Sequence, residues 1–305
     1  MTPVALQAEG LTLGYDRMTV FENLDLSIAE GTVTTLIGAN GSGKSTLLKA
    51  FGRLLAPTRG TVRLAGTPIA HLSARAVARR LAVLPQKPLT PAATTVGDLV
   101  MRGRHPHQSL LRPWTPADAG KVAAALAATG LEEVADRDVN SLSGGQLQRA
   151  WIALVLAQET PVILLDEPTT FLDLAHQLEV LRLVRSINRE RGSTIVMVLH
   201  DLGLAARYSD RLVVLGEGGV LADGEPWQVL TPELLESAFG LVADVIADPA
   251  SGTPLVVPLE PPEVSGGMAA GRTAELVEAS AHRRAGDPST GPGVVSNGSG
   301  IRRVT

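Results

Sequence analysis

The segment Gly38–Ser45, read GANGSGKS, constrains the fold of this chain more than any other. Its three glycines permit backbone turns that are closed to other residues, so that successive N–H groups can point at one anion. The β-branched run Thr32–Ile37 before it predicts a strand, and the pattern of Lys44–Phe51 after it is helical. A helix N-terminus favours the same anion. Strand, loop and helix together predict a phosphate-binding loop in an α/β fold.

The side chains of this loop give it a specific chemistry. Lys44 can neutralise charge on the β- and γ-phosphates of a nucleotide, and the Ser45 hydroxyl can ligate Mg²⁺. The alternative is an ordinary glycine turn before a helix, but the motif is complete and has the expected strand and helix on its two sides. The predicted nucleotide-binding residues are Gly38, Asn40, Gly41, Ser42, Gly43, Lys44, Ser45 and Thr46.

A second candidate site element is a pair of carboxylates at the end of an apolar run. Val162–Asp166 reads as a buried strand that ends in a carboxylate, and Glu167 follows it directly. At the open end of a parallel sheet, Asp166 can hold Mg²⁺ and Glu167 can orient the attacking water or accept its proton. Such a pair can also be a solvated helix N-terminus. Its combination with the glycine loop favours a catalytic role.

The rest of the chain alternates predicted strands with predicted helices, which indicates a parallel sheet covered on both faces. Apolar residues three or four apart predict one buried helix face in Leu174–Arg191, and helical character from Thr95 to about Asp136 predicts a separate helical subdomain. Thr95 with Asp98, and Thr115 with Pro116, fit helix N-termini. Further strands are expected at Thr61–Ala65, Leu81–Leu84 and Thr194–His200.

Composition excludes several classes of protein. The chain has 305 residues with 45% hydrophobic content and a net charge of −4, so it can bury a core and has no basic field for nucleic acid. It has no cysteine, which excludes disulfides and thiolate sites. No apolar run approaches the roughly 20 residues of a membrane span, and the N-terminus does not read as a secretory signal. We expect a domain at 1–259 and a disordered Gly-, Pro- and Ser-rich tail at 260–305.

The segment Leu142–Gln146, read LSGGQ, is the motif that points to one protein family. It resembles the signature sequence of ATP-binding cassette (ABC) proteins, although Ser143 also fits the N-cap of the helix that follows. The resemblance implies a P-loop NTPase fold: a RecA-like core with a parallel sheet, an N-terminal antiparallel β subdomain and an inserted α-helical subdomain at about 92–158. It also implies that the signature meets ATP held by a second subunit, through Ser143, Gly144, Gly145 and Gln146.

Four further positions match the family. The resemblance implies that Tyr15 stacks on adenine, that Gln86 touches Mg²⁺ and water, and that His200 contacts the γ-phosphate. Asp173 would couple the two composite sites of a homodimer, or of a pair with a similar subunit. Tyr15 could also be a half-buried strand residue, His200 a structural histidine at the end of a strand, and Asp173 a helix N-cap. A glutamine at position 86 is by itself uninformative. ATP and Mg²⁺ are therefore the expected cofactors, with Ser45, Gln86 and Asp166 as metal ligands and Lys44, Gln86, Glu167 and His200 as the catalytic set.

Two segments narrow the resemblance. Arg102–Gln108 and Thr169–Gln177 resemble the ATPases of importers for iron-siderophore, haem and vitamin B12, although His105 stands where that group often has tyrosine. We assign no metal to His105 and His107 and expect them to contact a permease or solvent. The resemblance implies a peripheral subunit on the cytoplasmic face of the membrane, working with permease subunits and indirectly with an extracytoplasmic substrate-binding protein. The alternative is a soluble ABC ATPase of iron-sulfur cluster assembly.

Overall fold

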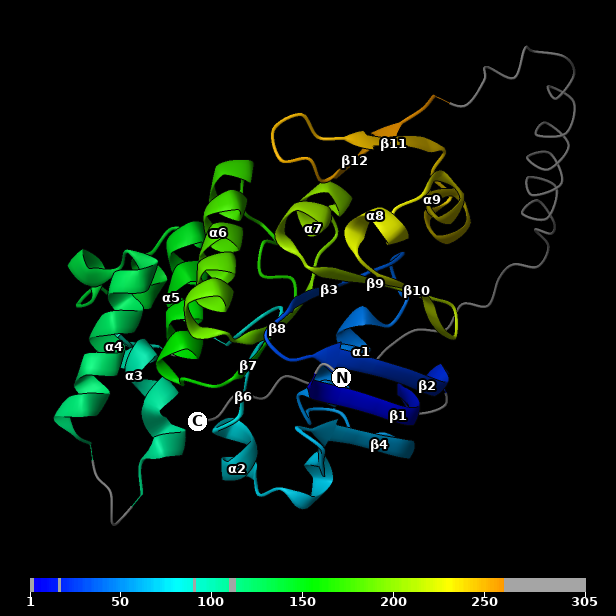
Figure 1. Cartoon of the computed structure of the whole chain (residues 1–305). Helices are drawn as coiled ribbons and strands as arrows, with labels where there is room; N and C mark the ends of the chain where they lie inside the picture. The colour runs from blue at the N-terminus through cyan, green and yellow to red at the C-terminus, as the bar shows by residue number, and fades with distance from the viewer. Residues whose placement is uncertain (1–2, 16–17, 90–91, 110–113, 261–305) are drawn as a thin grey trace, which may run out of the picture. The chain divides into compact units, whose positions relative to one another are not determined.

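The computed structural model describes residues 3–15, 18–89, 92–109 and 114–260 (Figure 1). Contacts divide the chain after Leu259, and of the segment beyond that residue only Glu260 is described. The predicted disordered tail at 260–305 otherwise lies outside the described residues.

A six-stranded sheet in the order β10-β9-β3-β8-β7-β6 forms the centre of this unit. The strand β3 pairs in parallel with β8 and β9, and β7 pairs in parallel with β6 and β8, whereas β10 is antiparallel to β9. Every residue of β3, β7 and β8 is buried, as parallel strands covered on both faces require. The predicted parallel sheet is confirmed. Its strands are β3 (Val33–Ile37), β6 (Leu81–Leu84), β7 (Val162–Leu165), β8 (Thr194–Val198), β9 (Arg211–Gly216) and β10 (Gly219–Gly224).

A second sheet is antiparallel and lies at the N-terminus of the chain, in the order β2-β1-β4-β5. Its inner face is apolar, with Leu6, Leu13, Phe21 and Ile28 fully buried in one cluster with residues of α1. This confirms the expected N-terminal β subdomain. The strands are β1 (Val4–Tyr15), β2 (Met18–Ala29), β4 (Arg59–Leu64) and β5 (Thr67–Pro68), and a separate hairpin consists of β11 (Ala243–Ala247) and β12 (Pro254–Pro258).

The helices begin at the capping residues that the sequence provides. Thr95, Ser143 and Asp173 each accept a hydrogen bond from the backbone N–H three residues ahead, and Thr115 and Asp118 form a complete capping box. The α-helices are α1 (Lys44–Phe51), α2 (Ala74–Ala78), α3 (Val96–Met101), α4 (Pro116–Thr129), α5 (Gly144–Ala157), α6 (Leu174–Arg191), α7 (Leu202–Tyr208), α8 (Pro226–Val229) and α9 (Pro232–Phe239). Short 3₁₀ helices occupy Ile69–His71, Arg102–His107, Glu132–Val134 and Val139–Ser141. Among the described residues, no helix has the length and apolar character needed to cross a membrane.

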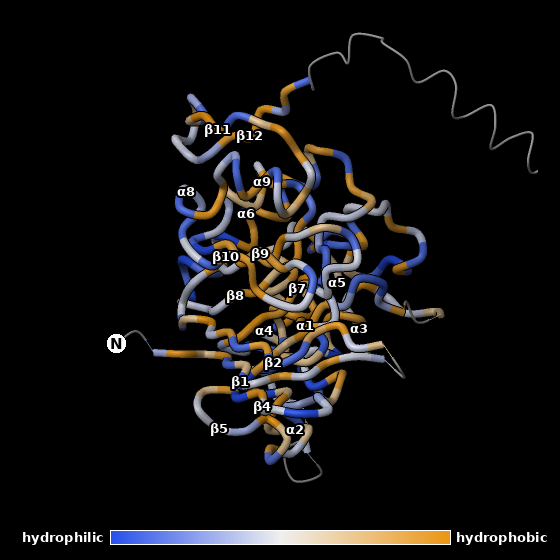
Figure 2. Tube along the Cα trace, turned by 90° about the vertical axis from the view of Figure 1, so that its right-hand side faces the viewer, coloured by the Kyte–Doolittle hydropathy of each residue, from blue (hydrophilic) through white to orange (hydrophobic). Residues whose placement is uncertain are grey.

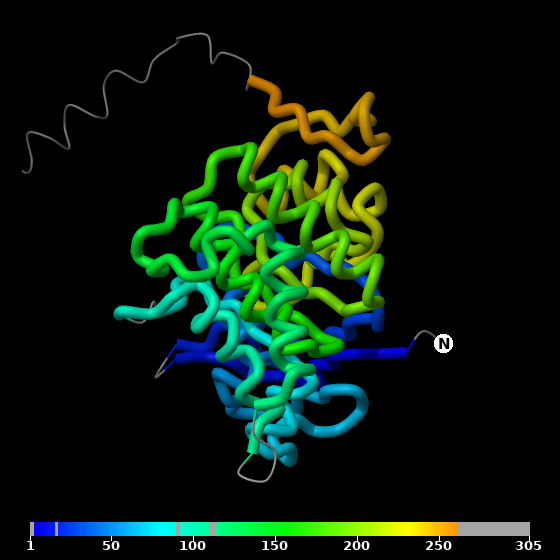
Figure 3. The backbone as a smooth tube through the Cα atoms, turned by 90° about the vertical axis from the view of Figure 1, so that its left-hand side faces the viewer, coloured from blue at the N-terminus to red at the C-terminus, as the bar shows by residue number. Residues whose placement is uncertain are grey.

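The helices α3, α4 and α5 form a group beside α6, away from the antiparallel sheet (Figure 1). Figure 3, turned to that side, shows the same green segments facing the viewer. Hydrophobic residues follow the central strands, as Figure 2 shows. Of the predicted helix face, Leu181, Val184 and Ile187 are buried, and full burial of such a side chain contributes about 1.5–3 kcal/mol. Leu174 is instead 64% exposed, because it lies in the first turn of α6, next to an exposed loop.

Four expectations about the extent of elements need correction. The strands predicted to reach Asp166 and His200 end earlier, at Leu165 and Val198, so both polar residues lie beyond the sheet. The strand predicted from Thr61 begins two residues earlier, at Arg59. Helical character from Thr95 to Asp136 is interrupted by the 3₁₀ segment with Pro106, since proline lacks the N–H that a continuing α-helix needs.

Candidate active site

Four neighbouring parallel strands end at the same edge of the sheet, and the predicted site residues follow them. Gly38 comes after β3, Gln86 lies two residues after β6, Asp166 and Glu167 come after β7, and His200 lies two residues after β8. Because carboxyl ends of parallel strands share one edge, residues far apart in the sequence meet there. This topology is the reason that the site can form.

Two glycines of the loop have no tolerable substitute. Gly38 has φ +149° and Gly43 has φ +90°, both unfavourable for side chains with a Cβ. A Cβ on Gly38 would lie 2.1 Å from the carbonyl oxygen of Leu215, and one on Gly43 would lie 2.4 Å from Cζ of Phe21. The loop therefore follows its path only with glycine at these positions.

Lys44 is held inside the loop that precedes it. Its Nζ donates hydrogen bonds of 2.9 Å to the carbonyl oxygens of Gly38 and Ala39, and the residue is 6% exposed. Burial lowers the pKa of the Lys44 ammonium, against the opposing effect of the nearby Glu167 and Asp166 carboxylates. The ammonium is thus a fixed positive charge at the centre of the site.

Ser45 and Asp166 form the second pair of the site. The Ser45 hydroxyl donates a hydrogen bond of 2.7 Å to Oδ1 of Asp166, and Asp166 is 4% exposed. Burial, with the nearby Glu167 charge, raises the pKa of Asp166, while the bond from Ser45 acts in the opposite direction. A hydroxyl and a carboxylate oxygen are ligands that suit Mg²⁺. The residues present therefore fit a magnesium site.

Glu167 is the most fully bonded carboxylate of the site. Its Oε1 lies 2.9 Å from Nε2 of His200, and its Oε2 accepts bonds from Gln86 Nε2 (2.7 Å) and Thr170 Oγ1 (2.9 Å). Burial raises the pKa of Glu167, but the bonds from His200, Gln86 and Thr170 outweigh it and leave that pKa lowered. The carboxylate is accordingly ionised at neutral pH and fixed at both oxygens. The structure brings together three of the four residues predicted to be catalytic, and Lys44 is close enough to contribute charge.

The remaining predicted loop and aromatic positions differ in exposure. Tyr15 ends β1 with 42% of its surface exposed, and Nζ of Lys49 lies 6.0 Å from the centroid of its ring. Asn40 and Gly41 are exposed in the loop, whereas Thr46 is buried in α1. A half-exposed ring of this kind can stack on a planar ligand.

The signature segment lies elsewhere on the chain. Ser143 and Gln146 form a capping box at the start of α5, with bonds of 3.3 Å from Gln146 N–H to Ser143 Oγ and 3.1 Å from Ser143 N–H to Gln146 Oε1. Ser143 and Gly144 are exposed, and Gly145 is buried. Asp173 caps α6 by accepting from His176 N–H at 3.0 Å. In the described part of the chain, no hydrogen bond joins this signature segment to the glycine loop.

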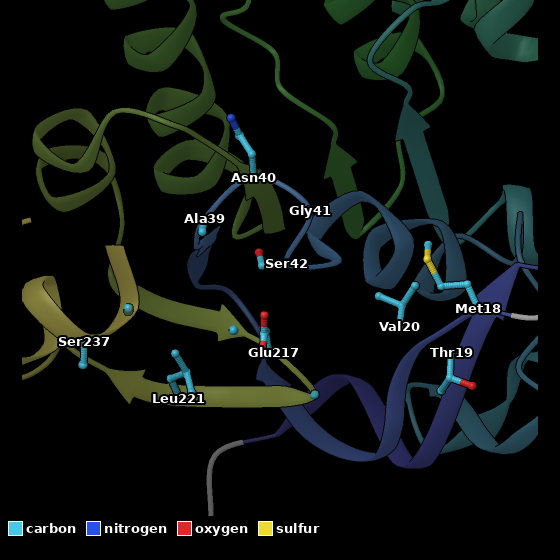
Figure 4. Close-up of a pocket in the computed structure, with 13 residues that line it drawn as sticks. Met18, Thr19, Val20, Ala39, Asn40, Gly41, Ser42, Glu217, Leu221 and Ser237 are labelled. Carbon is cyan, nitrogen blue, oxygen red and sulfur yellow. The ribbon is translucent and has the colours of Figure 1, made fainter. Parts of the chain in front are cut away.

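A cavity of about 630 Å³ opens beside the loop (Figure 4). It is lined by Val20 of β2, by Ala39–Ser42 and by the β9–β10 connection with Glu217. The Ser42 hydroxyl oxygen is buried and has no hydrogen-bond partner among the described residues. Lys44 and Asp166 are not part of the cavity lining, so the cavity is adjacent to the charged centre and does not contain it.

Two contacts of the described residues are not predictable from the sequence. Thr170 was not singled out as a site residue, although it lies three residues after Glu167, a spacing at which a turn can return its hydroxyl to that carboxylate. His107 was expected to contact a permease or solvent, yet its Nε2 lies 2.7 Å from the carbonyl oxygen of Gln158. His105 is exposed. Only the fold places residues 107 and 158 together.

Comparison with known proteins agrees with this geometry. The family model of the ABC transporter matches residues 21–170. The ferric enterobactin transport ATP-binding protein FepC of Escherichia coli (strain K12) is 51% identical over 254 residues, which cover 83% of this chain and 94% of that protein. The iron(3+)-hydroxamate import ATP-binding protein FhuC of Bacillus subtilis (strain 168) is 45% identical, with 82% and 93% covered.

Solved structures show the same fold. A metal-chelate type ABC transporter in an inward-facing conformation matches with a TM-score of 0.72 at 30% identity, covering 84% of this chain and 98% of that one. The cassette MJ0796, a dimer in a post-hydrolysis state with ADP and Pi, matches with a TM-score of 0.64 at 29% identity, covering 72% and 98%. The chain thus matches a known family in both sequence and fold. The chain belongs to the ATP-binding subunits of ABC transporters, which hydrolyse ATP to power transport.

Proposed function

We propose that this chain energises an importer of metal chelates, with ferric siderophores as the substrate class. The observation that carries the proposal is the Glu167 carboxylate, held by Gln86 and His200 beside the buried Lys44 and Asp166. The substrate class is supported by the names of relatives that are 45–51% identical, FhuC and FepC among them, and by the metal-chelate transporter structure. The same relatives favour import over iron-sulfur cluster assembly.

In this proposal the glycine loop holds the triphosphate of ATP. Backbone N–H groups of the loop and of the α1 N-terminus face the phosphate oxygens, and Lys44 neutralises their charge. Tyr15 stacks on the adenine ring. Mg²⁺ would be held by Ser45, Asp166 and Gln86, and when bound it neutralises charge on the β- and γ-phosphates. The 2.7 Å contact between Ser45 and Asp166 supports this ligand set.

Glu167 is proposed to act on the attacking water. Water forms a bond to the γ-phosphorus, the bond to the β–γ bridging oxygen breaks, and Glu167 orients the water or accepts its proton. Its lowered pKa supports an ionised carboxylate at neutral pH, ready to accept a hydrogen bond. His200 and Gln86 fix the direction of the carboxylate, and His200 also contacts the γ-phosphate.

The active site is proposed to be complete only in a homodimer. The exposed residues Ser143 and Gly144 would meet the γ-phosphate of ATP held by a second subunit through the N-terminus of α5. Gly145, Gln146 and Asp173 would belong to the same part of the site, which this chain contributes to the ATP held by the second subunit. Solved cassettes of 28–29% identity are dimers, which supports the arrangement.

A groove beside Gln86 is proposed to receive the permease. It has a volume of about 450 Å³ and lies between Pro85–Leu89 and the α5 residues Trp151 and Leu154. Leu89 is 92% exposed, and the Trp151 indole nitrogen is buried without a partner among the described residues. A short permease helix at this groove would contact both the helical subdomain, about 92–158, and the segment carrying Gln86. The subunit would then be peripheral on the cytoplasmic face of the membrane, linked through the permease to an extracytoplasmic substrate-binding protein.

The test is reconstitution of the whole transporter. The chain is co-expressed with its permease, reconstituted in vesicles with a binding protein, and its ATPase rate is measured with ferric siderophores, haem and cobalamin. Stimulation by ferric siderophores supports the proposal, while stimulation by haem or cobalamin alone overturns the substrate class. Purification with assembly-scaffold proteins in place of a permease overturns import.

A further inference from the structure

Two segments of this chain are proposed to act on ATP held by a second subunit: the signature segment at the start of α5 and Asp173 at the start of α6. They belong to different helices and are 30 residues apart. His176, in the first turn of α6, contacts both. Its Nδ1 lies 2.7 Å from Oδ1 of Asp173, and its ring lies against Gly145 of the signature segment.

The contact with Gly145 is close enough to determine the residue type. A Cβ on Gly145 would lie 2.6 Å from Cδ2 and 3.1 Å from Cγ of the His176 ring. The φ of Gly145 is not in the left-handed region, so the ring and not the backbone conformation excludes a larger residue here. An added Cβ would therefore require a shift of the ring that is bonded to Asp173.

A second contact lies one turn farther along the same two helices. Nη1 of Arg149 in α5 lies 2.7 Å from Oε2 of Glu179 in α6. The spacing from Gly145 to Arg149 and from His176 to Glu179 is four and three residues, which places each pair on one helix face. The two contacts together hold the start of α5 against the start of α6.

We infer that His176 is a positioning residue that fixes the signature segment to Asp173, so that the two parts reach the second subunit as one unit. This inference rests on the proposed two-subunit site. In this proposal His176 acts through Gly145 on one side and through Asp173 on the other. The sequence Thr169–Gln177, which contains His176, resembles one importer group, and the proposal gives this histidine a physical role there.

The experiment measures ATP-driven dimerisation of the full chain in the Glu167→Gln background, in which slow hydrolysis preserves the dimer. Gly145→Ala and His176→Ala are each expected to weaken dimerisation roughly ten-fold, within the usual range of coupling between contacting residues. The double variant is expected to lose roughly ten-fold as well, because each change breaks the same link. His176→Asn keeps a donor at the Nδ1 position and should retain dimerisation.

Controls separate a positioning role from a folding defect. Nucleotide binding to the monomer, read by fluorescent ATP, should be unchanged in every variant, because each chain holds ATP with its own loop. Gly120→Ala is the matched glycine control, since a Cβ there meets nothing within 4 Å. It should leave both dimerisation and nucleotide binding unchanged.

The outcomes distinguish the two proposals. If the Glu167→Gln parent does not dimerise with ATP, the proposed two-subunit function is wrong and this inference falls with it. If the parent dimerises but the effects of Gly145→Ala and His176→Ala multiply to roughly a hundred-fold, the two residues act independently and only this inference is wrong. Undiminished dimerisation of the His176→Ala variant would also overturn this inference.

Discussion

The hydroxyl of Ser45 donates a hydrogen bond of 2.7 Å to Oδ1 of Asp166, which joins the glycine loop to the end of β7. The two residues are 121 positions apart in the sequence. Their oxygens are therefore adjacent as a property of the fold, and a divalent cation that binds one of them finds the other in place. This relationship leads to the first prediction.

Ser45→Ala should weaken the magnesium dependence of ATP binding, since Asp166 and Gln86 remain as metal ligands. One oxygen ligand is lost while Lys44 and the loop N–H groups remain, so MgATP should bind about ten-fold more weakly, equivalent to about 1.4 kcal/mol. Binding measured with a chelator present should not change. Isothermal titration with and without Mg²⁺ checks this. An equal loss under both conditions would show that Ser45 acts on the nucleotide and not through the metal.

Glu167→Gln should reduce kcat at least about 100-fold, because a neutral amide cannot accept the proton of the attacking water. ATP affinity should remain, since the loop and Lys44 are unchanged. The variant should accumulate as a closed dimer with ATP, observable by size-exclusion chromatography. Normal turnover by this variant would show that another group acts on the water.

Thr170→Val should reduce kcat roughly three- to ten-fold at unchanged KM. The change is nearly isosteric and removes one of the two donors to Oε2 of Glu167, so the carboxylate loses part of its orientation. Thr170→Ser retains a hydroxyl and should restore the rate. If valine and serine variants hydrolyse ATP equally well, the hydroxyl has no role in turnover.

Asp118 should make the stability of the chain depend on acid pH. Bonds from Thr115 lower its pKa from 3.8 to about 2, helped by Arg104 and opposed by burial. A carboxyl with a lowered pKa stabilises the fold above its unfolded pKa, and the contribution disappears as pH falls from about 4 through about 2. The free energy of unfolding, measured with urea between pH 6 and 2, should therefore decline as the pH falls. The decline should be smaller in Asp118→Asn.

The Asp118→Asn variant should also be less stable at pH 7. Arg104 is 5% exposed, and its Nε lies 3.0 Å from Oδ1 of Asp118. The guanidinium retains Glu159 and the carbonyl oxygen of Ala157 as partners, so we expect a loss of about 3 kcal/mol, at the lower end for a broken buried pair. If the free energy of unfolding declines equally with falling pH in the parent chain and in Asp118→Asn, Asp118 is not the origin of the decline.

Leu89→Asp should abolish co-purification with the permease while nucleotide binding is retained. The side chain is almost fully exposed at the groove beside Trp151, so a charge there costs the fold little and opposes an apolar helix. Leu54→Asp is the matched control, since Leu54 is 63% exposed outside that groove. Equal loss in both variants would indicate general destabilisation.

Continuous motifs could be predicted from the sequence and were located correctly. The glycine loop lies between β3 and α1, and α6 begins and ends at the predicted residues because Asp173 caps its start and Gly192 adopts φ +65° at its end. These features depend on neighbours in the chain. The family resemblance, and not spacing, pointed to Gln86 and His200.

Other contacts could not be predicted in this way. The bond of Thr170 to Glu167 and the pairing of His176 with Gly145 depend on side-chain directions in a loop and on the approach of two helices. Composition and periodicity carry no information on either. The buried Arg104 pair is similar, because an arginine in a basic segment reads as exposed until α4 is placed against it.

Lys44 has a consequence for which ligands the loop can accept. Its ammonium is already fixed on two carbonyl oxygens, so the rotamer entropy of this lysine, up to about 2 kcal/mol, is lost during folding and not during binding. Two of its three N–H donors are thereby used, so an incoming anion finds one donor open and must displace a carbonyl oxygen to gain a second. A single phosphate presents fewer charged oxygens for that exchange than the adjacent β- and γ-phosphates, which reach the ammonium together. The loop should therefore discriminate against AMP before any contact with the base or the second subunit is made.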